Sequence, residues 1–103
     1  MLTSAVIAPS LVVAYVCRAF GVAEYEIRGT SRGKHISRAR RTAAWLLLEC
    51  CGMSLEDVGA ELNRHHTSII YQRDTAQKEM ESEGWQQAIR LMVERIEQEA
   101  MRV

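Results

Sequence analysis

Two runs of the sequence decide its fold, RGKHISRARR at Arg32–Arg41 and SLEDVGAELNRHHTSI at Ser54–Ile69. The second run holds two short segments whose apolar residues recur at helical spacing, separated only by Asn63-Arg64. Gly59 is small enough to let two helices cross closely at this point. This run therefore predicts a helix-turn-helix, with the basic run ahead of it.

Helical spacing of apolar residues continues along the rest of the chain, and no run alternates as a strand does. With 103 residues, of which 48% are hydrophobic, the chain is long enough for a single domain, residues 1–103, around one packed core. We expect an all-α fold of about five helices and a polar loop from Glu24 to Lys34. The helices are predicted from Pro9 to Gly21, His35 to Cys51, Leu55 (after the cap Ser54) to Leu62, His65 to Ser82 and Gly84 to about residue 100.

Charge is unevenly distributed although the formal net charge is zero. The segment from Arg28 to Arg41 has six basic residues and no acidic ones, and the remainder carries seven basic and thirteen acidic residues. Such asymmetry can give one face that attracts DNA and another that repels it. The alternative is an ordinary solvated helix face.

The second helix of a helix-turn-helix places its first residues in the major groove. Here they are His65, His66, Thr67 and Ser68, which are short or flat side chains with hydrogen-bonding groups. The Thr67 methyl group can also contact a thymine methyl. These features predict double-stranded DNA as the partner.

The chain resembles the C-terminal DNA-binding domain of the bacterial chromosomal replication initiator DnaA, which has a Trp-repressor-like fold. The resemblance covers about residues 11–80. The family pattern R-x-[RK]-x-[IV]-x-R-x-R-Q is matched at Arg32–Arg41, S-L-x-E-I-G at Ser54–Gly59, and R-D-H-T-T-V at Arg64–Ile69. Three short motifs in order and at compatible spacing make the resemblance specific.

The resemblance implies that Arg32 enters the minor groove with Lys34 as an auxiliary contact, and that Arg40 and Arg41 contact phosphates. It places His66, Thr67 and Ser68 at base edges and Arg64 at a base or phosphate. The full set of expected DNA-binding residues is Arg32, Lys34, Arg38, Arg40, Arg41, Leu55, Arg64, His65, His66, Thr67, Ser68 and Arg73.

The chain departs from the family pattern at four points that bear on its recognition sequence. His65 replaces an aspartate, Arg41 replaces a glutamine, Glu56 stands where proline is common, and the turn before Arg64 is one residue shorter than in many members. A chain of this length also has no room for the initiator's ATP-binding motor. The run Gly29–His35 fails as a phosphate loop, because it is one residue short and lacks the Ser/Thr after lysine. We therefore expect a replication- or transcription-related regulator without ATPase activity.

Other readings of the sequence stay open beside this one. The fold could serve a protein–protein adaptor that has lost sequence-specific DNA binding, although an adaptor would not need six uncompensated cations. Trp45 and Trp85 could stack on bases, but aromatic residues at this spacing are more often core. The apolar stripe of the last helix could form a homodimer, since it is broad for so small a domain.

No enzymatic activity, cofactor or metal is expected. His65 and His66 have no obvious carboxylate or nucleophile partner, and a zinc site that combined them with Cys50 and Cys51 would need adjacent cysteines pointing about 100° apart. Residues 5–17 are apolar but too few to span a bilayer and carry no preceding Lys or Arg. We expect a cytoplasmic protein with reduced thiols and no membrane partner.

Overall fold

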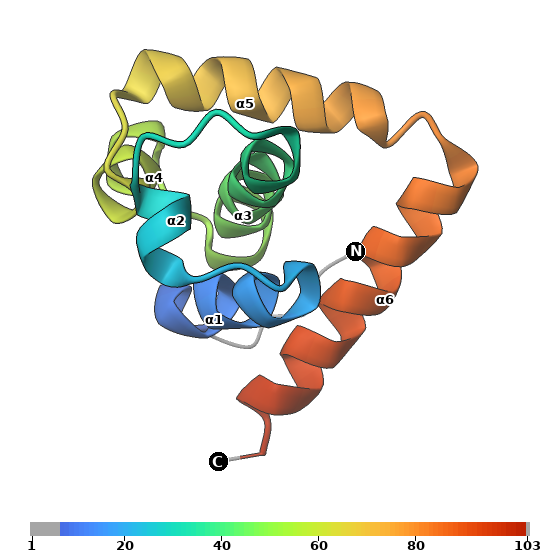
Figure 1. Cartoon of the computed structure of the whole chain (residues 1–103). Helices are drawn as coiled ribbons and strands as arrows, with labels where there is room; N and C mark the ends of the chain where they lie inside the picture. Colours follow the sequence, from blue (N-terminus) through green and yellow to red (C-terminus); the bar gives the residue numbers. More distant parts are fainter. Residues whose placement is uncertain (1–6, 103) are drawn as a thin grey trace.

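The structure is a computed structural model that describes residues 7–102, and this part of the chain forms six helices (Figure 1). They are α1 (Pro9–Phe20), α2 (Glu24–Arg28), α3 (Lys34–Cys51), α4 (Leu55–Leu62), α5 (His66–Glu79) and α6 (Glu83–Ala100). The predicted all-α class is confirmed.

Local sequence signals set most of the helix boundaries as predicted. Pro9 opens α1, where its fixed φ suits the first turn and its missing N–H is not needed. Gly21 and Gly52 end α1 and α3 in the left-handed region, at φ of 67° and 61°. The Ser54 hydroxyl caps α4 by accepting the Asp57 N–H at 3.1 Å, and Asn63 ends that helix at φ 57°.

The predicted loop from Glu24 to Lys34 is wrong in its first half, which forms α2. Five residues are too few to show helical periodicity, so tertiary contacts decide this element. The Glu26 carboxylate accepts the Ala23 N–H at 2.9 Å at the start of the helix, and Ile27 is completely buried. Residues 7–102 therefore form six helices, not five, and the irregular segment shrinks to residues 29–33, called the basic loop below.

The helix predicted to run to Ser82 ends at Glu79 instead. Met80 caps it, the Ser82 N–H donates to the Glu79 carbonyl at 3.1 Å, and α6 begins directly afterwards. The sequence predicted a break only at Gly84. The extra turn redirects the chain so that α6 can fold back on α1.

Helix α3 is the centre of the fold, with α1 and α5 packed on it and α2 and α4 beside it. Its inward residues Ala39, Ala43, Leu46 and Leu47 are fully buried. The other helices contribute fully buried aliphatic side chains to one core cluster: Val12, Val13, Val16, Ile27, Val58, Leu62, Ile69 and Ile96. This core fixes α3 and α5, the two long helices that flank the candidate site.

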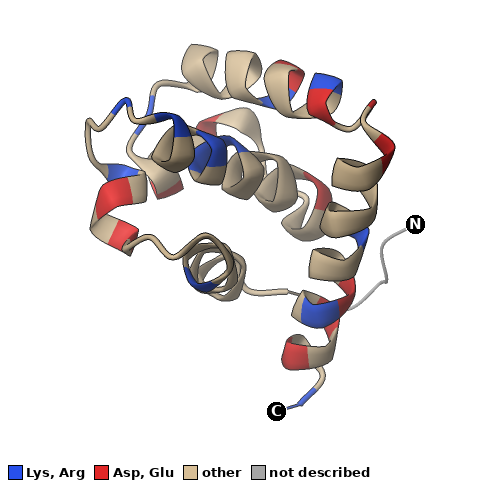
Figure 2. Ribbon diagram, turned by 45° about the vertical axis from the view of Figure 1, so that its right-hand side comes forward, with Lys and Arg blue, Asp and Glu red and all other residues tan. Residues whose placement is uncertain are grey.

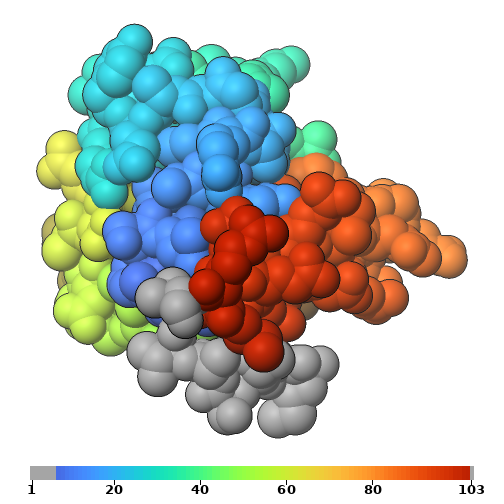
Figure 3. All heavy atoms as spheres, turned by 90° about the horizontal axis from the view of Figure 1, so that it is seen from below, coloured from blue at the N-terminus to red at the C-terminus, as the bar shows by residue number. Residues whose placement is uncertain are grey.

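The apolar stripe of α6 is used within the chain. Ile89 and Ile96 are buried, Met92 is partly buried, and Trp85 packs edge-on against Phe20 with ring centroids 6.3 Å apart. Figure 3 shows the end of α6 lying beside α1. The breadth of this stripe is therefore explained by packing inside the domain, and it gives no separate reason for a dimer.

Candidate nucleic-acid interface

Helices α4 and α5 form the predicted helix-turn-helix, and Gly59 lies where they approach. The Arg64 N–H donates to the Gly59 carbonyl at 2.7 Å. A Cβ atom at Gly59 would lie 2.4 Å from the Arg64 carbonyl oxygen, closer than real Cβ contacts allow. Glycine is therefore required here by close backbone approach, as the sequence predicted.

His65 is the N-cap of α5. Its Nδ1 accepts the Thr67 N–H at 3.3 Å and lies 2.9 Å from the Thr67 hydroxyl. The His65 and His66 rings lie next to each other, with centroids 4.3 Å apart. Histidine thus keeps the capping acceptor that an aspartate would supply, without its negative charge.

The first turn of α5 leaves Thr67 exposed, with His66 and Ser68 half-buried beside it. Their hydroxyl and imidazole groups lie at a helix amino terminus, where the helix dipole favours a nearby anion. The surface therefore combines groups that can read base edges with a local preference for phosphate.

Arg32 in the basic loop and Lys34 at the start of α3 are exposed, and within residues 7–102 no acidic side chain pairs with them. Figure 2 shows Lys and Arg concentrated on this loop and the adjoining half of α3, with Asp and Glu on α2, at the end of α5 and on α6. The charge asymmetry of the sequence is thus also an asymmetry in space.

A groove of about 730 Å³ is bordered by the basic loop, α3 and α5. It is lined by Thr30, Ser31, Arg32, Ser37, Arg40, Arg41, Arg64, Ser68, Tyr71, Gln72 and Thr75. Hydroxyl, amide and guanidinium groups dominate this lining, which suits an oxyanion such as phosphate.

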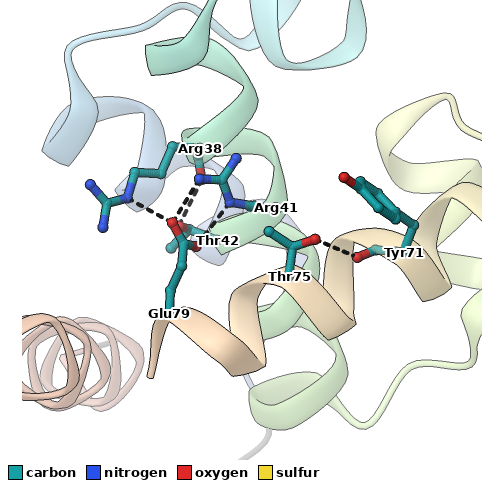
Figure 4. A network of polar contacts seen from close by, with 6 residues as sticks. All are labelled: Arg38, Arg41, Thr42, Tyr71, Thr75 and Glu79. Carbon is teal, nitrogen blue, oxygen red and sulfur yellow. Dashed lines mark hydrogen bonds and ion pairs between the residues drawn. The ribbon is translucent and has the colours of Figure 1, made fainter. Parts of the chain in front are cut away.

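Two arginines of α3 are held by one carboxylate at the end of α5 (Figure 4). Arg41 donates to both oxygens of Glu79, at 2.9 and 2.6 Å, and Arg38 forms an ion pair with the same carboxylate at 3.2 Å. The guanidinium of Arg38 also lies over the Trp85 ring, 3.9 Å from its centroid. Hydrogen bonding from Arg41 lowers the pKa of Glu79, and hydrogen bonding from Glu79 raises the pKa of Arg41.

Arg40 and Arg64 donate to backbone carbonyls of the protein. Arg40 is 6% exposed and donates through Nε to the Ile27 carbonyl at 2.7 Å. Arg64 is half-buried and donates to the Asn63 carbonyl at 3.0 Å and to the Gly29 carbonyl. Both guanidinium groups therefore hold backbone of the protein itself.

The six cations from Arg28 to Arg41 are therefore not uncompensated, and that expectation is corrected. Arg28 pairs with Glu24 and Glu61 at 2.8 Å each, and Glu79 pairs with both Arg38 and Arg41. Acidic residues distant in the sequence approach this segment through the fold. Arg32 and Lys34 remain as the cations of the segment that are exposed and unpaired within residues 7–102.

The structure brings five of the twelve predicted site residues to the groove: Arg32, Arg40, Arg41, Arg64 and Ser68. The other seven lie outside its lining. Leu55 is partly buried against the core, Arg73 pairs with its neighbour Asp74 at 3.2 Å, and Arg38 packs on Trp85. Lys34, His65 and Thr67 are exposed and His66 is half-buried.

Sequence reasoning missed Tyr71, Gln72 and Thr75, which form the α5 wall of the groove with Ser68. Tyr71 is 73% exposed. The spacing of these residues from Ser68, at three, four and seven positions, is that of one helix face. The same spacing rule would have found them.

Residues 7–102 contain no cluster of three or more His, Cys, Asp or Glu side chains that could hold a metal ion. Cys17, Cys50 and Cys51 are free, and burial raises the pKa of Cys50 to about 12. In residues 7–102 there is no helix both long and apolar enough to cross a membrane.

A helix-turn-helix with a basic loop beside its second helix defines the class of nucleic-acid-binding helix-turn-helix domains. The family described as "Bacterial dnaA protein helix-turn-helix" matches residues 9–75, and the chain belongs to this family. Membership supports DNA binding. Helix α6 lies outside the matched range.

Curated relatives agree with this assignment. The chain is 34% identical over 76 residues to the chromosomal replication initiator protein DnaA of Thermomicrobium roseum, an alignment that covers 73% of this chain and 16% of the relative. It is 29% identical over 72 residues to the protein of the same name in Oleidesulfovibrio alaskensis, covering 70% of this chain and 16% of that relative. The chain thus matches about a sixth of the length of these relatives.

Proposed function

We propose that the domain binds double-stranded DNA with sequence selectivity, in a replication- or transcription-related regulatory role in the cytoplasm and without catalytic activity of its own. In this proposal the first turn of α5 enters the major groove, and His66, Thr67 and Ser68 contact base edges. Arg32 of the basic loop enters the adjacent minor groove, with Lys34 beside it.

The groove between the basic loop and α5 is the observation that carries the proposal. A protein that occupies neighbouring major and minor grooves must straddle the phosphate strand that separates them. The cavity of about 730 Å³ lies between the two elements assigned to those grooves, and Arg41, Tyr71 and Ser68 line it with donors. It therefore offers a place for that strand.

The neutralised arginines set the expected strength of the electrostatic contribution. If Arg32 and Lys34 neutralise phosphates, log affinity should fall against log salt with a slope of about −2. Six free cations would have given about three times that slope. Contacts with bases in the DNA grooves should therefore contribute a larger share of the affinity than the six basic residues of the sequence suggest.

Fluorescence anisotropy with a duplex that carries an initiator-type DnaA box and with a shuffled duplex, at about 50 and 200 mM salt, tests the proposal. Preference for the box duplex, with moderate salt dependence, supports it. If both duplexes bind with equal affinity and that affinity falls with salt, the protein binds DNA without sequence selectivity. Absence of binding to either duplex would contradict it.

The second candidate function is a protein–protein adaptor, and the pairing of Arg28, Arg38 and Arg41 with acidic residues favours it. These cations do not require DNA to balance their charge. The exposed face of α6, where Leu91 is 50% exposed, would then be a candidate contact for a partner or a second copy. The same anisotropy experiment separates the two functions, because an adaptor would bind neither duplex.

A further inference from the structure

We propose that Arg40 and Arg64 are positioning residues, which hold the basic loop at a fixed place relative to the amino terminus of α5, and that neither contacts DNA. This inference rests on the proposed DNA binding. It differs from the phosphate contact that family resemblance implies for Arg40 and from the base or phosphate contact expected of Arg64.

Arg40 reaches the end of α2 and both sides of the basic loop. Besides Ile27, it donates to the carbonyls of Glu26 at 3.0 Å, Ser31 at 3.2 Å and Gly29 at 3.4 Å. The last carbonyls of a helix lack partners within the helix, and a buried cation that bonds them stabilises both the helix end and its own charge. Arg40 thus shapes the loop from α2 to Ser31.

Arg64 reaches the same backbone from the turn before α5. It donates to the carbonyls of Asn63 at 3.0 Å, Leu62 at 3.4 Å and Arg28 at 3.5 Å, and also to that of Gly29. The Gly29 carbonyl therefore accepts from both Arg40 and Arg64. One carbonyl links α3, the basic loop and the turn of the helix-turn-helix.

The backbone around Gly29 has little room to move. A Cβ atom at Gly29 would lie 2.8 Å from the Tyr25 carbonyl oxygen, so the backbone at this position is tightly packed. Burial and the nearby charge of Arg64 lower the pKa of Arg40, in keeping with two cations that share one set of carbonyls. An arginine in such a place stays charged, and its five N–H donors are spread over a rigid planar fork that suits several separated acceptors, whereas the three donors of a lysine all lie on one nitrogen.

The link lies between the two surfaces assigned to DNA. Arg32 lies one residue after Ser31, and His65 follows Arg64 directly. Arg64 holds Gly29 and Arg40 holds Ser31, and together these bonds fix the distance from the loop to the first turn of α5 before DNA arrives. Preorganisation of two contacting elements improves binding to a site with the matching spacing, because less ordering entropy is lost.

Arg40→Lys and Arg64→Lys test the proposal, since each keeps the charge and loses the fork. We expect faster amide hydrogen exchange in residues 29–33 of the free protein. We also expect at least a tenfold loss of preference for the box duplex over the shuffled duplex. The salt slope should stay at the wild-type value, because no phosphate contact is removed. Arg90→Lys, at an exposed position on α6 away from the groove, is the matched control and should leave hydrogen exchange in residues 29–33 and the preference for the box duplex unchanged.

A phosphate-contacting Arg40 gives a different result. Lysine would then largely retain binding, while Arg40→Gln would weaken binding to both duplexes alike and make the salt slope shallower by about 0.9. That pattern, or unchanged exchange in both lysine variants, would overturn the proposal. Hydrogen exchange needs no DNA, so failure of the wild-type protein to bind DNA would contradict the proposed function and leave the positioning role testable in the free protein.

Discussion

Glu79 at the end of α5 holds Arg41 of α3 through both carboxylate oxygens, with N···O distances of 2.9 and 2.6 Å. The two residues are 38 positions apart in the chain, and the side chains retain only 21% exposure at Arg41 and 18% at Glu79. The pair joins the basic helix to the second helix of the helix-turn-helix. It also removes much of the positive charge of Arg41 from the groove.

Replacing Glu79 by glutamine should lower the free energy of unfolding by about 1–2 kcal/mol at pH 7, because a two-point charged hydrogen bond becomes a neutral one. The same change frees charge on Arg38 and Arg41, so the salt slope of DNA binding should steepen by about one. Urea unfolding and anisotropy measure the two effects. Glu81→Gln, at an exposed position two residues later, is the control. An unchanged slope would place Arg41 away from the phosphates.

The Glu79 pair should also make stability depend on pH in the acid range. Hydrogen bonding from Arg41 lowers the pKa of Glu79 in the folded protein. The unfolded chain therefore binds the proton more readily, and the contribution of the pair is complete above the unfolded pKa of about 4.3 and lost as pH falls through the folded value. The free energy of unfolding of Glu79→Gln should accordingly fall less than that of the wild type between about pH 5 and pH 3. If the stability of the two proteins falls equally with pH, the stabilising role of the Glu79–Arg41 pair is contradicted.

Gly59→Ala should destabilise the domain by about 2 kcal/mol, because the new methyl group meets backbone that cannot move aside. The nearest atom is the Arg64 carbonyl oxygen, 2.4 Å from the Cβ position. Gly84→Ala is the matched control, since a Cβ atom there meets nothing within 4 Å. Alanine in α6 should be neutral or stabilise it by up to about 1 kcal/mol. Thermal unfolding of the two variants distinguishes close approach from a general effect of helix propensity.

Arg32→Ala should make the salt slope of DNA binding shallower by about 0.9, as one exposed cation leaves the interface. Arg90→Ala removes an exposed cation from α6, away from the groove, and should leave the slope unchanged. Anisotropy at several salt concentrations compares them. Equal effects of the two substitutions would indicate attraction by overall charge alone and contradict a specific contact by the basic loop.

Cys50 should react slowly with iodoacetamide in the native protein at pH 8, since burial raises the pKa of its thiol to about 12 and the thiolate is the reactive form. Because the folded pKa lies above that of the unfolded chain, stability should fall as pH rises from about 9 toward 12. Mass spectrometry of alkylated peptides, with urea-unfolded protein as the control, measures the reactivity. Rapid native labelling of Cys50 would show that the thiol is accessible and ionised.

Short-range signals account for the elements that sequence analysis predicted correctly. Pro9, Gly21, Gly52 and Ser54 act within one turn of the chain, so their roles follow from neighbouring residues alone. The short helix α2 escaped prediction because its stability comes from the burial of Ile27 and from Arg40, thirteen residues further along the chain.

The predicted site residues also fall into two groups, those set by local sequence and those set by tertiary contacts. The exposure of Arg32, Lys34 and Thr67 agrees with roles at a surface, which depend mainly on their chemistry and their place at a loop or helix start. The environments of Arg38, Arg40 and Arg41 could not be predicted, because Glu79, Trp85 and the carbonyls of α2 reach them only after folding. Charge patterns in a sequence count cations without showing which of them are paired.

The sequence by itself determined the all-α class, the helix-turn-helix at residues 54–69 and the resemblance to the DnaA family, because helix periodicity, caps and motif spacing are local properties of a chain. Only the tertiary structure decided which arginines lie open to solvent. Packing brings Glu79 beside α3 and turns Arg40 toward the Gly29 carbonyl. The direction and pairing of a long charged side chain depend on partners that are distant in sequence and close in space.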